Sequence, residues 1–202
     1  MRLIGILDSP YVRRVAVSLT FMGLEFSQES VSVFRHYEAF AAINPVVKAP
    51  TLVTDAGMVL MDSTLILDYA ERVALPERRL SPSGIEDYAR GQRLTGLALA
   101  ACEKMVQIVY EHNLRPAEKR HQPWLDRVIG QLRQAWGLIE GETGDGWLCG
   151  GRPLAPDIAV AVAWRFGQSM VADAVPAANY PMIGKFASRA EALPEFRAWP
   201  PD

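Results

Sequence analysis

The hydrophobic pattern of this 202-residue chain changes once, close to residue 76, and this change limits the folds open to it. Before it, short apolar runs typical of strands alternate with segments whose apolar residues recur at helical spacing. After it, the pattern is helical throughout. The boundary stretch 75–83 contains Pro76, Pro82 and two adjacent arginines, a composition typical of a linker. We therefore predict an α/β domain over residues 1–76, a linker over 77–85 and an all-helical domain over 86–202.

The first domain is predicted to hold a mixed four-stranded sheet. Residues 3–7 form a continuous apolar run, typical of a strand buried on both faces. Ser9-Pro10 then reads as a helix cap followed by proline at the first helical position, and Gly23 is suited to end that helix. The remaining expected elements are a strand in 26–33, a short helix in 37–43, a hairpin over 51–61 and a helix from residue 62 onward. Their order is β-α-β-α-β-β-α.

The second domain is predicted to be a helical bundle. Apolar residues mark one face of a helix about 30 residues long, which ends before Pro116, and of a second helix over 125–139. Residues 141–151 contain five glycines and are expected to form a loop. The run 158–164 is apolar on every side, so its helix is expected to be the buried centre of the bundle. A last helix is expected over 180–193.

Composition and charge exclude several classes of function. The chain has 21 basic and 23 acidic residues, a net charge of −2, and no basic stripe, so we expect no nucleic-acid partner. The longest apolar run has seven residues, from Ile158 to Trp164, whereas a membrane span needs roughly 18 or more. The N-terminal residues become polar too early for a signal peptide. We expect a soluble, cytoplasmic protein with no membrane partner.

Metal and disulfide chemistry are not expected. Cys102 and Cys149 are the only cysteines, and they belong to no short motif, as is usual in a reducing compartment. The three histidines, at positions 36, 112 and 121, have no zinc-like spacing. The sequence also lacks a nucleophile elbow, a phosphate loop and a dinucleotide fingerprint.

Five local patterns in order along the chain carry a family resemblance: Ser9-Pro10-Tyr11-Val12-Arg13-Arg14-Val15, Asn44-Pro45-x-x-Lys48-Ala49-Pro50, Asp62-Ser63-x-x-Ile66-x-x-Tyr69, Ala155-Pro156-Asp157-Ile158-Ala159, and Tyr180-Pro181 with Arg189 and Pro194. The chain resembles the cytosolic glutathione transferases, in particular bacterial serine-type members related to the tau, omega and zeta classes. The resemblance implies a thioredoxin-like first domain, an all-α second domain and a homodimer.

Two positions depart from the family pattern. Leu154 stands where the family has a serine or threonine that caps the central helix, and losing such a cap typically costs about 1 kcal/mol. Pro156, at an early helical position, can compensate through its fixed φ. Ala49 replaces the family's valine or isoleucine, but the family uses the backbone of this residue. We also expect Asp157 to be buried and to accept backbone N–H bonds from the preceding loop.

Ser9 is the candidate catalytic residue that the resemblance implies. Its hydroxyl would donate a hydrogen bond to the sulfur of glutathione and favour the thiolate. Lowering a thiol pKa of ~8.5 by two units needs about 2.7 kcal/mol. A charge-assisted hydrogen bond supplies roughly 1.5–3 kcal/mol and a helix dipole ~0.3–1 kcal/mol, so no other catalytic group is required. The alternative is that Ser9 only caps the helix, with Asp8 as a competitor for that cap.

The same resemblance implies the residues that bind glutathione. Asp62 and Ser63, at a helix start, would hold the γ-glutamyl amine and carboxylate, although plain helix capping is the alternative. A cis peptide bond at Ala49-Pro50 would present the Ala49 backbone to the cysteinyl part. Lys48 and His36 are candidates for the glycine carboxylate, the alternatives being a surface lysine and an ordinary loop histidine.

Four further residues are candidates to line a pocket for an electrophile: Tyr11, Met105, Val109 and Trp164. For the last three, the simpler interpretation is bundle core. The predicted function is a glutathione transferase that conjugates the thiolate to a small apolar electrophile, as in detoxification. A glutathione-dependent isomerase or dehalogenase with the same site remains open, as does a non-catalytic interaction protein like the stringent-starvation relatives. The sequence does not identify the electrophile.

Overall fold

The computed structural model describes residues 1–201, and contacts within the chain divide it into two compact units. Unit 1 comprises Met1–Ser81 together with Ala192–Asp202, and unit 2 comprises Pro82–Glu191. The predicted range of the second domain, 86–202, differs from this division, since the C-terminal residues group with unit 1. The 3₁₀ helix η1 (Pro76–Arg78) overlaps the start of the predicted linker, and the buried Leu80 lies within it. Glu71 accepts a hydrogen bond from the Leu80 N–H.

Unit 1 contains a four-stranded mixed sheet, as predicted. The strands β1 (Arg2–Ile4), β2 (Ser27–Glu29), β3 (Thr51–Val53) and β4 (Val59–Met61) lie in the order β2-β1-β3-β4. β1 pairs parallel with β2 and antiparallel with β3, and β3 pairs antiparallel with β4 in the predicted hairpin. The first strand is shorter than the predicted 3–7 because Gly5, with a φ of +142°, leaves the extended conformation.

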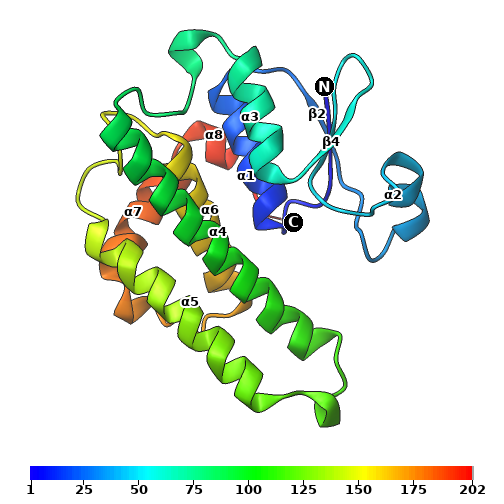
Figure 1. The fold of residues 1–202 in the computed structure, drawn as a ribbon, viewed down its shortest axis with the longest axis vertical. Helices are drawn as coiled ribbons and strands as arrows, with labels where there is room; N and C mark the ends of the chain where they lie inside the picture. The colour runs from blue at the N-terminus through cyan, green and yellow to red at the C-terminus, as the bar shows by residue number, and fades with distance from the viewer. Residues whose placement is uncertain (202) are drawn as a thin grey trace. The chain divides into compact units, whose positions relative to one another are not determined.

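Helices cover both faces of this sheet: α1 (Pro10–Phe21) and α3 (Ser63–Val73) lie on one face, and α2 (Tyr37–Ile43) lies on the other (Figure 1). Gly23 terminates helix α1, as predicted from the sequence. Gly23, with a φ of +68°, donates to the Thr20 carbonyl, and Leu24 donates to the Leu19 carbonyl, which together form a Schellman motif. The expected thioredoxin-like topology is confirmed.

The C-terminal segment belongs to unit 1 because it packs on α1. Arg13, which is buried, donates hydrogen bonds to the carbonyl oxygens of Trp199 and Phe196, and the latter lies in α8 (Pro194–Arg197). The Trp199 indole stacks on Phe26, with ring centroids 5.0 Å apart, and donates to the Thr20 hydroxyl. Arg13 and Thr20 therefore hold this segment to the first helix, and the aromatic stack holds it to Phe26, just before β2.

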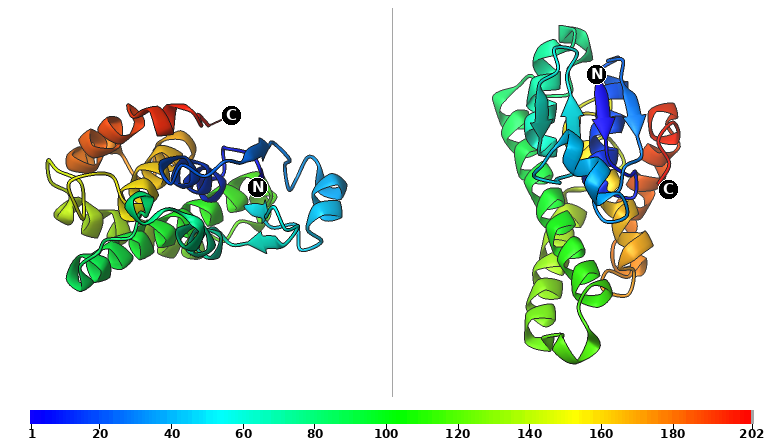
Figure 2. Two further views of the ribbon diagram at one scale, coloured as in Figure 1. Left: turned by 90° about the horizontal axis from the view of Figure 1, so that it is seen from above. Right: turned by 90° about the vertical axis from the view of Figure 1, so that its right-hand side faces the viewer.

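Unit 2 is helical, as predicted, and its long helices α4 (Ile85–Asn113) and α5 (Gln122–Glu142) run side by side (Figures 1 and 2). Between them lies the 3₁₀ helix η2 (Ala117–Lys119). The central helix α6 (Ala155–Met170) packs on α4 and on α7 (Pro181–Glu191), which follows the 3₁₀ helix η3 (Ala177–Asn179). All residues from 156 to 164 are buried, including the run 158–164 whose apolar composition predicted this.

Asp157 has the predicted role at the start of α6. The residue is 1% exposed, and its carboxylate accepts hydrogen bonds from the N–H groups of Leu148, at 2.8 Å, and Leu154, at 2.9 Å. Burial raises the pKa of Asp157 to about 6, although these two hydrogen bonds and the charge of Arg189 act in the opposite direction. Leu154, as the N-cap residue, supplies no side-chain acceptor, and Pro156 occupies an early helical position.

Candidate functional site

The register of the sheet brings the predicted glutathione-binding segments to one end of unit 1. Ile4 at the end of β1 pairs with Thr51 at the start of β3, and Thr51 pairs with Met61 at the end of β4. Ile4 also pairs with Glu29, the last residue of β2. The segments that contain Ser9, His36, Lys48 to Pro50, and Asp62 with Ser63 therefore all leave or enter the sheet at this end.

Ser9 is the N-cap of α1, rather than Asp8. Its Oγ accepts a hydrogen bond from the Val12 N–H at 3.4 Å, and the side chain is partly exposed. In the described part of the chain, no group accepts the hydroxyl proton of Ser9. The cap bond uses a lone pair of Oγ, so the proton remains available to a ligand at the N-terminus of α1. Capping and thiolate stabilisation are therefore compatible in this residue.

A second helix start, that of α3, carries Asp62 and Ser63. Asp62 is the N-cap, and its Oδ1 accepts from the Thr64 N–H at 2.9 Å. Its φ is +70°, a conformation that non-glycine residues rarely adopt. Strain of this kind typically occurs at binding sites, where the surrounding structure maintains it.

Arg14 is a site residue that the sequence interpretation missed. It is 5% exposed, and its Nη1 donates to the Ser63 Oγ at 3.1 Å and to the Thr64 Oγ1 at 3.3 Å. A buried guanidinium therefore lies beside the α3 N-terminus, where it adds full positive charge to the partial charge of the helix dipole. Arg14 stands in the motif from Ser9 to Val15, but it lies off the helical face marked by Val12, Ala16 and Leu19, so no spacing in the sequence indicated its role.

The predicted cis peptide bond between Ala49 and Pro50 is confirmed. The Ala49 side chain lies close to Gly5: a Cβ built on that glycine would lie 3.3 Å from the Ala49 Cβ and only 2.6 Å from Val12 Cγ2. Gly5 therefore allows α1 and the Ala49 segment to approach the end of β1 closely. The neighbouring Lys48 is exposed, with its side chain at the surface.

His36 is the N-cap residue of α2 and is exposed. Its Nδ1 accepts a hydrogen bond from the Ser32 N–H at 3.2 Å. This bond places the ring proton of the neutral imidazole on Nε2, which leaves one N–H donor directed away from the backbone. The arrangement fits the predicted contact with a carboxylate but does not require it.

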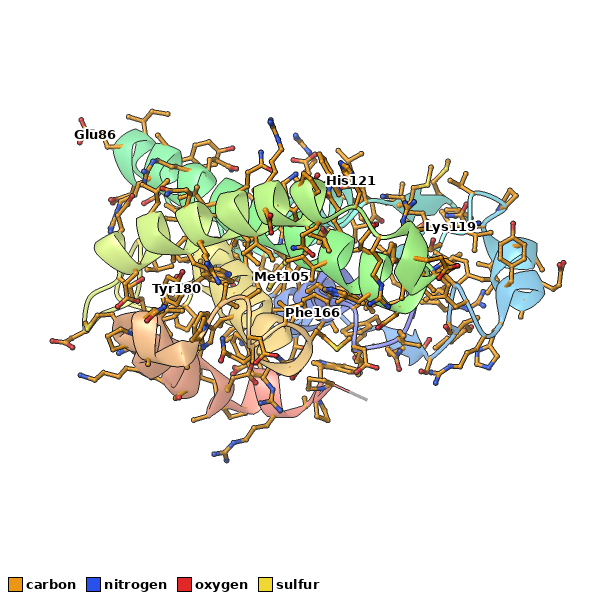
Figure 3. All side chains as sticks on the ribbon, turned by 90° about the horizontal axis from the view of Figure 1, so that it is seen from below. Glu86, Met105, Lys119, His121, Phe166 and Tyr180 are labelled. Atoms are coloured by element: carbon orange, nitrogen blue, oxygen red, sulfur yellow. The ribbon has the colours of Figure 1, made fainter. Side chains whose placement is uncertain are left out.

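The four candidates for the electrophile pocket lie in different surroundings. Tyr11 is partly exposed on α1 in unit 1, and Val109 is partly exposed on α4 in unit 2. Met105 is fully buried inside the helical unit (Figure 3), where its Sδ lies 2.8 Å from a Cβ built on Gly167. Trp164 is buried between Trp136 and Tyr180, with edge-to-face ring contacts. The surroundings of Met105 and Trp164 match the bundle-core alternative.

Residues 1–201 hold no group of three or more histidine, cysteine, aspartate or glutamate side chains arranged to bind a metal ion. Within the same range, no helix has both the length and the apolar character that a membrane crossing requires.

Known proteins resemble this chain along nearly its whole length. A glutathione S-transferase from Methylobacterium radiotolerans, solved in complex with glutathione sulfonate, has 27% sequence identity and a TM-score of 0.92, covering 99% of this chain and 94% of its own. A maleylacetoacetate isomerase from Pseudomonas aeruginosa is 29% identical over an alignment that covers 91% of this chain and 88% of the isomerase. The GST-like protein YibF of Escherichia coli is 28% identical over 81% of this chain and 80% of its own.

The family comparison assigns the first unit directly. Residues 3–77 match the model described as "Glutathione S-transferase, N-terminal domain", a range that contains all four strands and Ser9, Ala49 and Ser63. The helical remainder of the chain aligns with the corresponding part of the M. radiotolerans enzyme. Residues 3–77 of this chain therefore form a glutathione S-transferase N-terminal domain, and the chain as a whole has the fold of the M. radiotolerans glutathione S-transferase.

Proposed function

We propose that this protein is a glutathione transferase of the serine type, which conjugates the thiolate of glutathione to a small apolar electrophile. The observation that carries the proposal is the Ser9 hydroxyl at the N-terminus of α1, whose proton no group in residues 1–201 accepts. The sulfur belongs to the cosubstrate, so the protein supplies orientation and electrostatic stabilisation. The thiol proton leaves to solvent. The thiolate forms the new bond to carbon as that carbon loses a leaving group, which departs with the bonding electron pair, or as the π bond of an activated alkene opens and its electron pair takes up a proton from solvent.

The α3 N-terminus is suited to hold the γ-glutamyl carboxylate. Ser63 Oγ accepts from Arg14, so its hydroxyl proton is directed elsewhere and can be donated to a carboxylate oxygen. Arg14 and the helix dipole both favour an anion at this position. Asp62, whose Oδ1 caps the helix, retains a second oxygen for the γ-glutamyl ammonium group. Lys48 and His36 are proposed to bind the glycine carboxylate.

Ser9→Ala tests the proposal through the pKa of bound glutathione. Removing one charge-assisted hydrogen bond should raise the thiol pKa by about one to two units, equivalent to ~1.5–3 kcal/mol. Conjugation near neutral pH should then fall roughly ten- to a hundredfold, while the Kd of glutathione changes little. The measurements are the pH profile of conjugation and the ultraviolet absorbance of the bound thiolate.

Ser9→Thr is the matched control, since it keeps both the cap acceptor and the hydroxyl proton. It should retain a pKa close to that of the parent. If Ser9→Ala leaves the pKa and the rate unchanged, Ser9 is only a helix cap and the catalytic assignment is wrong. If the parent does not bind glutathione at all, the interaction-protein alternative replaces the transferase.

A glutathione-dependent isomerase is the second candidate, because the similarity to the P. aeruginosa maleylacetoacetate isomerase extends over 91% of this chain. In that reaction the thiolate adds to a carbon–carbon double bond, rotation follows, and elimination regenerates glutathione. The same Ser9 would serve both reactions. Glutathione consumption distinguishes them: conjugation consumes one glutathione per product, and isomerisation consumes none.

We also propose that the protein is a homodimer. Unit 1 exposes the apolar side chains of Met58, just before β4, of Val59 in β4, and of Leu65 in the first turn of α3. β4 is the outer strand of the sheet order, so its far side has no neighbouring strand in unit 1. A second copy of the chain is the proposed partner that covers this surface.

A further inference from the structure

Two buried polar side chains in unit 1 form a hydrogen-bond relay beneath the Lys48–Ala49 segment. Asn44, 4% exposed, donates from Nδ2 to the Thr51 Oγ1 at 2.8 Å, and the Thr51 hydroxyl donates to the Lys48 carbonyl oxygen at 2.8 Å. Thr51 is fully buried at the start of β3. Because the amide occupies a lone pair of the hydroxyl, the hydroxyl proton is directed toward Lys48.

Holding the Lys48 carbonyl also sets the direction of the next N–H group. The peptide bond from Lys48 to Ala49 is trans and planar, so its N–H points opposite to its C=O. The carbonyl points toward Thr51, and the Ala49 N–H therefore points away from β3. Within residues 1–201, no group accepts a hydrogen bond from the Ala49 N–H.

The loop between Asn44 and Pro50 does not hold this shape by intrinsic preference. Val47 has a φ of +52°, which is unfavourable for a β-branched residue. Asn44 stabilises the loop with two further hydrogen bonds. Its Oδ1 accepts from the Val46 N–H, and its backbone carbonyl accepts from the Val47 N–H. A strained loop that is fixed by one asparagine and one threonine depends on both.

We propose that Asn44 and Thr51 are positioning residues for glutathione. They touch no ligand themselves, but they aim the Ala49 N–H at the cysteinyl carbonyl of the bound tripeptide. This inference rests on the proposed function. It adds two residues that set the affinity for glutathione without acting on the thiolate, whereas Ser9 acts on the thiolate.

Thr51→Val removes the hydroxyl and keeps the size and the β-branched shape. We expect the Kd and the KM of glutathione to rise about tenfold, with kcat at saturating glutathione within about twofold of the parent and an unchanged thiol pKa. Thr51→Ser, which keeps the hydroxyl, should bind glutathione with a Kd close to that of the parent. Binding is measured by isothermal titration calorimetry with glutathione itself.

Thr54→Val is the matched control. Thr54 is also a buried threonine, one residue past the other end of β3, and its Oγ1 accepts from the Met58 N–H in the hairpin turn. Its replacement should lower the melting temperature without changing the Kd of glutathione. Equal increases in Kd for both valine variants would overturn the proposal, because the effect would then reflect a general weakening of the sheet.

Asn44→Asp tests the other residue of the hydrogen-bond relay. This variant also provides the test of the proposal if Thr51→Val does not fold. The carboxylate has no proton to donate and would accept the Thr51 hydroxyl proton, releasing the Lys48 carbonyl. We expect a rise in Kd similar to that of Thr51→Val. An unchanged Kd in folded Thr51→Val or Asn44→Asp overturns the relay while the transferase proposal stands. No binding of glutathione by the parent overturns both proposals.

Discussion

The buried carboxylate of Asp157 predicts an unusual pH dependence of stability. Its pKa is raised from 3.8 in the unfolded chain to about 6 in the folded protein, with loss of hydration as the largest cause. Between these values the folded state binds a proton that the unfolded state has released. The contribution of Asp157 to the free energy of unfolding is therefore complete below about pH 4, declines as the pH rises toward 6, and is constant above that.

The size of this effect follows from the shift. A difference of about two pKa units, at about 1.4 kcal/mol per unit, corresponds to about 3 kcal/mol of stability lost between pH 4 and pH 6. Other carboxylates titrate in the same range, so the measurement must be a difference between the parent and Asp157→Asn. Asparagine has nearly the same shape and does not titrate, although it keeps only one of the two acceptor oxygens that Leu148 and Leu154 use.

Urea unfolding followed by tryptophan fluorescence is the assay, because four of the five tryptophans lie in unit 2: Trp124, Trp136, Trp147 and Trp164. The stability advantage of the parent over Asp157→Asn should shrink as the pH rises from 4 to 6. An advantage that grows over this range would refute the reasoning. It would mean that the hydrogen bonds from Leu148 and Leu154 outweigh burial and that the folded pKa lies below 3.8.

Two other predictions concern unit 1. Arg14→Lys should raise the Kd of glutathione about tenfold, as measured by calorimetry. The reason is that an ammonium group lacks the fork geometry with which the guanidinium reaches both Ser63 and Thr64. An unchanged Kd would show that Arg14 has only a packing role. Sedimentation should give a dimer of about 45 kDa, twice the chain mass of 22.4 kDa. Leu65→Asp, which places a charge on the exposed apolar surface, should shift the equilibrium toward the monomer. A monomeric parent at micromolar concentration would contradict the proposed dimer.

Local signals in the sequence predicted most of the fold. Ser9-Pro10 and Gly23 act within one turn of the helix that they delimit, so their effect depends little on the rest of the structure. The hairpin around Asp55 to Gly57 is local in the same way. The course of residues 192–201 could not be predicted, since it depends on hydrogen bonds from Arg13 to groups more than 180 residues away in the sequence.

The residues of the candidate site also fall into two groups: those whose role could be predicted from the sequence and those whose role depends on distant partners. Ser9, Ala49 and Ser63 could be selected because the family resemblance implies a role for each of them. Arg14 and Asn44 stand in the same short motifs, but their contributions, like that of Thr51, depend on the partners they reach, and no spacing in the sequence indicates that Arg14 lies beside Ser63, 49 positions away. The cis bond at Pro50 came from the family resemblance, since sequence statistics alone favour trans.

The two serines of the site share one arrangement, and it suggests why each begins a helix. Ser9 Oγ accepts from the Val12 N–H, and Ser63 Oγ accepts from the Arg14 guanidinium. In both cases a donor from the protein occupies the acceptor side of the hydroxyl, which directs the proton outward before any ligand arrives. Little reorientation is then needed when an anion binds, and such preorganised donors stabilise charge more effectively than groups that must turn. The helix start supplies partial positive charge at the same position, so at α1 the helix cap and the proposed thiolate site coincide in Ser9, whereas at α3 Asp62 caps the helix and Ser63 faces the proposed carboxylate.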